Sequence, residues 1–194
     1  MNSSTLYIFD FDDTLVSSGA NVKVTHADGT IELLKSHEFA TYKPEKEDQF
    51  DFTEFDVYPP NGKLITNTFR ILKKSIKEND AHDIIVLSAR GEAKPMRDFL
   101  GDNGVTSPIG IVGVGSSDPN AKSNVVLQKI SKNPGRYQEV VIYEDSINNI
   151  TAITKAIHKE YPDISVVANK VEIKQEVLLR STIRALIHEI IIKD

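Results

Sequence analysis

The sequence predicts an α/β fold built on a doubly wound parallel sheet. Short apolar runs rich in β-branched residues alternate along the chain with segments whose apolar residues recur at helical spacing. Within the runs, consecutive positions are apolar, which is typical of parallel strands buried on both faces. Strands that alternate with helices form doubly wound sheets, whose ligands bind at the carboxyl ends of the strands. Residues just after each strand are therefore the first candidates for a site.

Five apolar runs are expected to form the sheet. They are Leu6–Phe9, Ile84–Leu87, Ile109–Val114, Val140–Tyr143 and Ile164–Val167. Four helices are expected between them, around the apolar residues from Leu64 to Ile76, Met96 to Leu100, Val125 to Ile130 and Ile150 to Ile157. Asp118 is a good N-cap for the third of these helices, and Pro119 suits its first position.

Residues 17–61 separate the first strand from the first long helix and are predicted to form a small cap insertion. A hairpin is expected from Val22–His26 and Thr30–Leu34, because Asp28-Gly29 between them is a turn signal. Alternating apolar residues in Phe50–Phe55 predict another strand. A segment this long is uncommon as an idle loop in a compact domain, so a cap or lid is expected.

Two stretches, 1–16 and 62–170, then make up the core. Residues 171–194 carry an apolar stripe at helical spacing and predict a C-terminal helix. Such a helix either packs on the core or forms a dimer contact, and the stripe alone does not separate the two.

Composition excludes several classes of protein. The chain has 194 residues and no cysteine, so disulfides, thiolate catalysis and cysteine-ligated zinc are excluded. Its net charge of -5 argues against a surface that broadly coats nucleic acid, although a local basic site stays compatible with it. The N-terminal residues lack the pattern of a signal peptide, and no apolar run approaches the roughly 20 residues that span a bilayer. We therefore expect a cytoplasmic protein with no membrane partner.

Two carboxylates follow the first strand, in the run Tyr7-Ile-Phe-Asp-Phe-Asp-Asp-Thr. Residues i and i+2 of an extended chain point the same way, so Asp10 and Asp12 are expected to face one site. Two anions this close repel unless a proton or a cation lies between them. Mg²⁺ prefers oxygen ligands and is the simplest explanation. The alternative is a strand followed by an Asp-rich turn.

Three further polar signals occur in order near the ends of later strands. They are Ser88 with Arg90, then Lys122 at a helix start, then Glu144 with Asp145. Each has an ordinary explanation when taken singly: a turn serine, a solvated lysine, and acids favoured by a helix N-terminus. The combination is far more specific than any one of them.

This order resembles the motifs of the haloacid dehalogenase (HAD) superfamily over about Thr5 to Ile157. The resemblance implies a Rossmann-like core with a cap and a phosphomonoester hydrolase that forms an aspartyl-phosphate. It makes Asp10 the nucleophile, and Asp12 the group that protonates the leaving oxygen and then activates water.

The same resemblance assigns the remaining residues. Ser88 donates a hydrogen bond to the phosphoryl group, and Lys122 neutralises the charge of that group and of Asp10. Mg²⁺ is bound by the carboxylates of Asp10 and Asp145 and by the backbone carbonyl of Asp12. Many relatives have Asp where this chain has Glu144, whose role stays open between a ligand through water and a more distant support. Either Asn148 or Asn149 is a candidate to orient this loop.

The substrate is less defined. Leu87-Ser-Ala-Arg90 and the spacing Asp118-x-x-x-Lys122 resemble the phosphatase half of polynucleotide kinase-phosphatases, and the chain resembles small phage-encoded HAD proteins. This implies 3′-phosphate ends of nucleic acid or nucleotides as substrates, with Arg90 on a phosphate or in an ordinary salt bridge. The acidic cap favours a small phosphorylated metabolite instead. A non-catalytic binding or regulatory protein is the third alternative.

Overall fold

A five-stranded parallel sheet forms the centre of the computed structural model, which describes residues 4–39, 42–59 and 61–172. The strand order is β10 (Ser165–Lys170), β9 (Tyr137–Glu144), β1 (Ser4–Phe9), β7 (Ile84–Ser88) and β8 (Gly110–Gly113). From β1 the chain runs outward through β7 and β8, and then returns to β9 on the other side of β1. The switch in strand order therefore lies between β1 and β9, where α/β sheets commonly bind ligands. All five predicted strands are confirmed.

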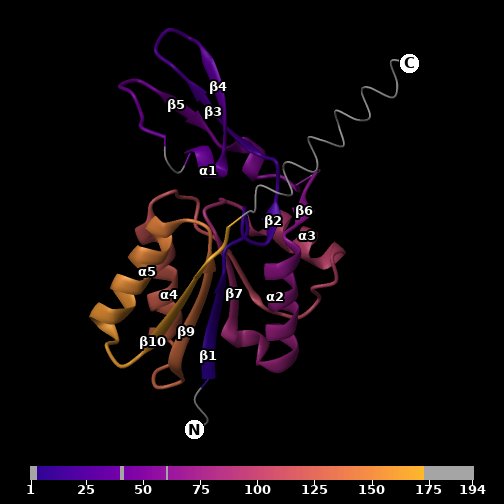
Figure 1. The fold of residues 1–194 in the computed structure, drawn as a ribbon, viewed down its shortest axis with the longest axis vertical. Coiled ribbons are helices and arrows are strands. Elements are labelled where there is room, and N and C mark those ends of the chain that lie inside the picture. Colours follow the sequence, from indigo (N-terminus) through magenta and orange to yellow (C-terminus); the bar gives the residue numbers. More distant parts are fainter. Residues whose placement is uncertain (1–3, 40–41, 60, 173–194) are drawn as a thin grey trace.

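Helices cover both faces of this sheet (Figure 1). On one face lie α2 (Thr66–Glu78) and α3 (Ala93–Asp102), and on the other α4 (Pro119–Ser131) and α5 (Ile147–Glu160). Residues of β1 alternate accordingly: Ile8 packs in the cluster that contains α4 and α5, whereas Phe9 packs in the cluster with α2 and α3. As predicted, Asp118 caps α4, because its side chain accepts a hydrogen bond from the Asn120 amide.

The insertion after β1 contains a separate antiparallel sheet. Where the insertion leaves and rejoins the core, β2 (Val16–Ser17) pairs with β6 (Lys63–Leu64) in a two-stranded sheet. The separate antiparallel sheet of the insertion has three strands in the order β4 (Ile31–Lys35), β3 (Asn21–Thr25) and β5 (Gln49–Asp51). The 3-10 turn η1 (Thr53–Phe55) follows β5 in the chain. A short helix, α1 (Ser36–Phe39), follows β4, and a 3-10 turn, η2 (Ala81–Asp83), precedes β7.

Figure 1 shows this small sheet beyond the carboxyl ends of the central strands. It has a cluster of buried apolar residues of its own, formed by Val22, Val24, Leu34 and Phe55. We call residues 17–61 the cap. Its position above the strand ends puts it over the place where a doubly wound sheet binds its ligand.

The predicted hairpin is present as β3 and β4, but the prediction of a strand over Phe50–Phe55 is only partly right. Pairing with β3 stops at Asp51, whose carboxylate accepts a hydrogen bond from the Thr53 amide at 2.9 Å. Such a side-chain turn competes with strand pairing, and η1 follows it.

The predicted C-terminal helix of residues 171–194 lies almost wholly outside the described residues. Within the described ranges, none of the helices has both the length and the apolar character needed to cross a membrane.

Candidate functional site

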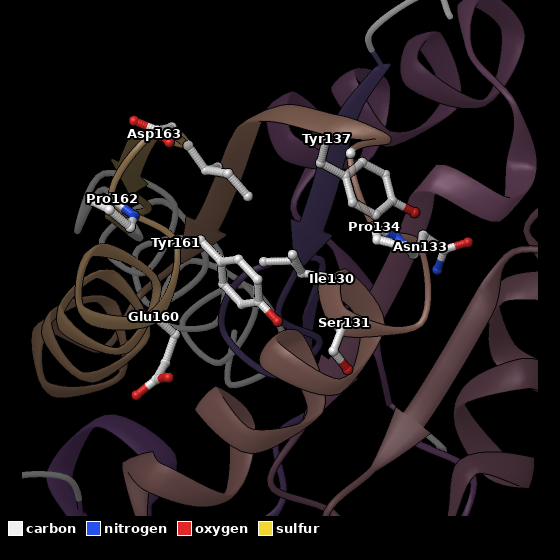
Figure 2. A pocket seen from close by; sticks show the side chains of 11 residues that line it. Ile130, Ser131, Asn133, Pro134, Tyr137, Glu160, Tyr161, Pro162 and Asp163 are labelled. Carbon is white, nitrogen blue, oxygen red and sulfur yellow. The ribbon is translucent and has the colours of Figure 1, made fainter.

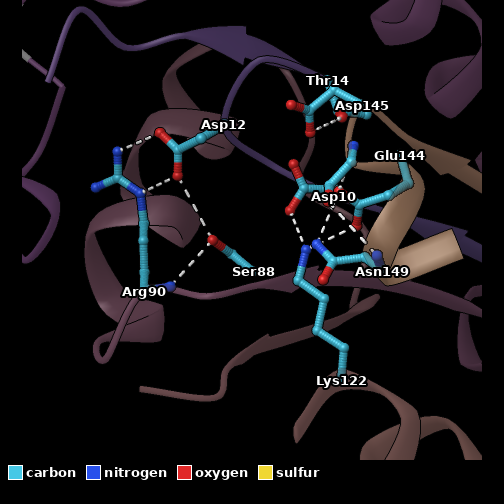
Figure 3. Close-up of polar contacts among 10 residues, drawn as sticks. Asp10, Asp12, Thr14, Ser88, Arg90, Lys122, Glu144, Asp145 and Asn149 are labelled. Carbon is cyan, nitrogen blue, oxygen red and sulfur yellow. Dashed lines mark hydrogen bonds and ion pairs between the residues drawn. The ribbon is translucent and has the colours of Figure 1, made fainter. Parts of the chain in front are cut away.

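The predicted site residues converge at the carboxyl edge of the sheet (Figure 3). Asp10 follows β1, and its amide donates to the Tyr143 carbonyl of β9, so it lies next to the end of that strand. Glu144 is the last residue of β9, and Ser88 is the last residue of β7 on the other side of β1. Lys122 lies in the first turn of α4. The parallel topology thus brings together residues that are far apart in the sequence.

Lys122 is the centre of the first group of contacts. Its Nζ lies 2.6 Å from Oδ1 of Asp10 and 2.7 Å from Oε2 of Glu144. All three residues are buried. A lysine buried to this degree requires paired anions. Lys122 was predicted to lie near Asp10, whereas its contact with Glu144 was not foreseen.

Glu144 is bound through both of its carboxylate oxygens. Besides Lys122 on Oε2, Asn149 Nδ2 donates to Oε1 at 3.1 Å, and the Ser146 amide donates to the same oxygen at 3.2 Å. Ser146 is the N-cap of α5, and Asn149 lies in the first turn. The start of α5 therefore orients Glu144. Of the two asparagines considered, Asn149 makes this contact, and Asn148 is exposed.

The carboxylates of Asp10, Glu144 and Asp145 form a compact acidic group. Each offers one oxygen to a set whose members all lie within 4.8 Å of one another. Thr14 Oγ1 donates to Oδ1 of Asp145 at 3.5 Å. Three carboxylates against the single ammonium of Lys122 leave an excess of two negative charges when all are ionised. A hard divalent cation fits this set of oxygen donors and this charge.

The excess charge also shifts the pKa values in the group. Burial, and then the Glu144 charge, raise the pKa of Asp10 well above its usual range, and Lys122 only partly offsets them. The same two causes raise the pKa of Asp145 to about 7. Burial by itself lowers the pKa of Lys122, but the Asp10 and Glu144 carboxylates outweigh it and raise that pKa above its ordinary value. Lys122 is therefore charged, and the acids compete for protons or for a cation.

Asp12 contacts other partners than Asp10 does. Its two carboxylate oxygens each accept a 2.7 Å hydrogen bond from Arg90, one from Nε and one from Nη2. Ser88 Oγ donates to Oδ2 at 3.5 Å. In Figure 3, Asp12 points toward Arg90 and Ser88, whereas Asp10 points toward Lys122. Arg90 thus forms the bidentate pair with a carboxylate of the protein itself.

The separation of Asp10 from Asp12 has a local cause. The rule that residues i and i+2 face the same side holds only in an extended chain, and β1 ends at Phe9. Beyond it the chain turns tightly, with two amides donating to the Phe11 carbonyl and Asp13 at a φ of 58°. Although Asp10 and Asp12 are close in sequence, their carboxylates therefore contact different partners, Lys122 and Arg90.

Sequence reasoning missed the contact between Arg90 and the cap. Arg90 Nη1 donates to the backbone carbonyls of Phe55 and Val57, the latter at 3.2 Å. Every residue carries a carbonyl, so the sequence offers no signal for these acceptors. Their position also depends on η1, where a strand was expected.

A cavity of about 420 Å³ lies elsewhere (Figure 2), between the C-terminal ends of α4 and α5 and beside the start of β9. None of the predicted site residues lines it. Its charged lining residues are Glu160 and Asp163, with no Lys, Arg or His among the described residues that line it. This lining is unsuited to a phosphate.

The chain was compared with protein-family models, with curated proteins and with solved structures, and none of the three comparisons found a match.

Proposed function

We propose that this chain is a Mg²⁺-dependent phosphomonoester hydrolase of the HAD type that acts through an aspartyl-phosphate on Asp10. The observation that carries the proposal is the buried contact of Lys122 with Asp10 and Glu144, next to Asp145, at the switch point of the sheet. A carboxylate held beside a cation and among further oxygen ligands is suited to attack a dianionic phosphate, whose charge otherwise repels a nucleophile.

In the first step, an Asp10 carboxylate oxygen attacks phosphorus and the bond to the leaving oxygen breaks. Asp12, whose two carboxylate oxygens accept from Arg90, must first take up a proton, which it then gives to that oxygen. In the second step, Asp12 takes a proton from water, water oxygen attacks phosphorus, and the bond to Asp10 breaks. Asp12 also contacts Ser88, whose hydroxyl is available to donate to a phosphoryl oxygen.

Lys122 holds Asp10 in place by the 2.6 Å contact and offsets charge that builds up on the phosphoryl group. Asp10 and Asp145 would hold Mg²⁺ through their carboxylates, and Asp12 through its backbone carbonyl. When bound, the metal neutralises charge on the phosphate and on the acidic group. Glu144 is retained by Lys122 and by the start of α5, and it supports the site by fixing Lys122.

A small phosphate ester is the better supported substrate class. Arg90, for which a phosphate or an ordinary salt bridge was left open, has its hydrogen bonds within the protein. Exposed acids on the cap, Glu45, Glu47, Asp51, Glu54 and Asp56, oppose the close approach of a long polyanion. A 3′-phosphorylated oligonucleotide is the competing substrate and belongs in the same test.

The test is phosphate release with Mg²⁺ from an aryl phosphate, nucleoside monophosphates, sugar phosphates and a 3′-phosphorylated oligonucleotide. Wild type is compared with Asp10→Asn, and with Asp118→Asn as the matched control. Asp118 is an exposed N-cap near the same edge, and asparagine also caps helices. We expect Asp10→Asn to lower the rate at least about a thousandfold and Asp118→Asn to leave it nearly unchanged.

The preferred ester then identifies the substrate class. Release that is equal in wild type and Asp10→Asn, or absent for every ester, would contradict the proposal and favour a non-catalytic binding or regulatory protein.

A further inference from the structure

Arg90 joins the candidate site to the cap. Its guanidinium makes two hydrogen bonds to the carboxylate of Asp12 and two to cap carbonyls, those of Phe55 and Val57. The residue is 3% exposed. An arginine has five N–H donors in a rigid plane. Here four hydrogen bonds from this group reach two separate parts of the protein, the loop after β1 and the cap.

The same guanidinium also contacts two aromatic rings, one from the loop after β1 and one from the cap. Its central carbon lies 5.1 Å from the ring centroid of Phe11, in the loop after β1, and 5.4 Å from that of Phe55, in the cap. Phe55 also belongs to the apolar cluster of the cap. The plane of the guanidinium is therefore set by the loop that carries Asp12 and by the cap together.

The backbone of Arg90 is fixed to the sheet edge. Its amide donates to Ser88 Oγ at 3.2 Å, and its carbonyl accepts from the Gly115 amide at 3.0 Å. The loop after β7 is thereby tied to the loop after β8. Movement of the cap would consequently change the contacts of the Arg90 side chain while its backbone stays in place.

We propose that Arg90 is a positioning residue that couples the seating of the cap to the orientation of Asp12. With the cap seated, the Phe55 and Val57 carbonyls aim the guanidinium, and the guanidinium aims both oxygens of Asp12. When the cap lifts, Arg90 loses two acceptors and one ring, and Asp12 loses its fixed orientation. The kinetic consequence rests on the proposed hydrolase function, but the coupling itself is measurable without turnover.

Coupling between two sites is reciprocal, and this gives the sharpest test. Asp12 has no direct hydrogen bond to the cap among the contacts of the described residues; its link runs through Arg90. If Arg90 couples them, removing the Asp12 carboxylate must loosen the cap. A cap held independently of Asp12 would be unaffected.

The experiment is hydrogen–deuterium exchange of peptides that cover residues 49–59, without substrate, in wild type, Asp12→Ala and Arg90→Lys. Arg136→Lys is the matched control, because Arg136 makes a similar bidentate pair with Asp83 away from the cap. We expect exchange of this segment to rise about tenfold or more in Asp12→Ala and Arg90→Lys, since charged hydrogen bonds are lost. Arg136→Lys should leave it unchanged.

Should Asp12→Ala fail to fold, Asp12→Asn keeps the side-chain shape while presenting an amide N–H₂ to the guanidinium, and the same rise is expected. Exchange of residues 49–59 in either Asp12 variant that equals wild type would overturn the coupling.

Kinetics distinguish positioning from substrate binding. A positioning role predicts that Arg90→Lys lowers kcat for an aryl phosphate about tenfold or more with KM within about twofold, because Asp12 acts in the chemical step. A rise in KM with kcat unchanged would mean that Arg90 binds the phosphate and would overturn the proposal. If wild type releases no phosphate while Asp12→Ala still loosens the cap, the hydrolase proposal fails and the coupling stands.

Discussion

The Nζ atom of Lys122 lies 2.6 Å from Oδ1 of Asp10, and both side chains are buried. Among the described residues, Lys122 is the only cation with a hydrogen bond to the acidic group of Asp10, Glu144 and Asp145. The charge of Lys122 therefore affects folding as well as any chemistry. Without it, the buried carboxylates would be ionised with no cation beside them, which is costly.

Replacing Lys122 by an uncharged residue should therefore lower the folding free energy. Lys122→Met keeps most of the side-chain volume and removes the charge, and we expect a loss of about 3–5 kcal/mol of folding free energy. Mg²⁺ should restore part of the loss, since it supplies positive charge to the same carboxylates. Urea unfolding with and without Mg²⁺ measures both effects. Lys94→Met is the control, because Lys94 is exposed and pairs with Asp98, so it should cost at most about 1 kcal/mol. Equal losses in the two variants would contradict this account.

Metal binding should stabilise the wild type and depend on Asp145. A ligand at 100 times its Kd stabilises a protein by about 2.7 kcal/mol, which is seen as a rise in Tm. We expect Mg²⁺ to raise the Tm of wild type and of Asp118→Asn alike, and Asp145→Asn to lose most of the shift. Thermal unfolding over a series of Mg²⁺ concentrations gives the affinity. A full shift in Asp145→Asn would remove this residue from the proposed ligands.

The alternation of strands and helices could be predicted because it depends on local patterns of apolar residues. Val140–Tyr143 is apolar at every position, and in β9 its first three residues are buried and Tyr143 is half-buried, since a parallel strand covered on both faces needs such a run. Because parallel strands end at one edge of the sheet, Asp10 and Glu144, at the ends of neighbouring strands, lie together at that edge. Expected bounds differed by a few residues because strand ends are set by pairing partners.

The orientation of individual side chains was beyond the sequence. Asp12 turns to Arg90 because the chain leaves the extended conformation after Phe9, and a two-residue spacing does not reveal this turn. Glu144 reaches Lys122 through a contact between the end of β9 and the start of α4, which is set by the tertiary packing. The Arg90 contact with the Phe55 carbonyl involves a backbone atom that every residue has.

The cap should have a pH-dependent stability that originates at His26. Its Nδ1 lies 2.9 Å from Oδ1 of Asp48, and the hydrogen bond to Asp48 raises the pKa of His26 above 6.5. Tyr42 donates to the other oxygen of Asp48 at 2.6 Å, and this bond raises the pKa of Tyr42 to about 12, so it remains a donor. Glu32, 3.6 Å from Nε2, and Asp28 are further charges that raise the pKa of the imidazole.

The direction follows from the raised pKa of His26. The folded cap holds the proton more tightly than the unfolded chain, so the stabilisation is present below about pH 6.5 and is lost as the pH rises through the raised pKa. We expect wild type to exceed His26→Gln in stability at pH 6 by more than at pH 8.5, in urea unfolding. A wild-type advantage that grows with pH would reverse the assignment.

Gly113 at the end of β8 should be intolerant of any side chain. A Cβ there would lie 2.5 Å from the Arg90 carbonyl oxygen and 3.1 Å from the Gly91 carbonyl, which are backbone atoms that give way only if the loop moves. We expect Gly113→Ala to destabilise the fold by about 1–3 kcal/mol and to increase exchange in the cap, because that loop carries Arg90. Gly101 in α3 is the matched control, since a Cβ there meets nothing within 4 Å. Gly101→Ala should stabilise by about 0.5–1 kcal/mol through its helix propensity. Urea unfolding of both variants decides the matter, and a neutral Gly113→Ala would show that the loop is free to shift without cost.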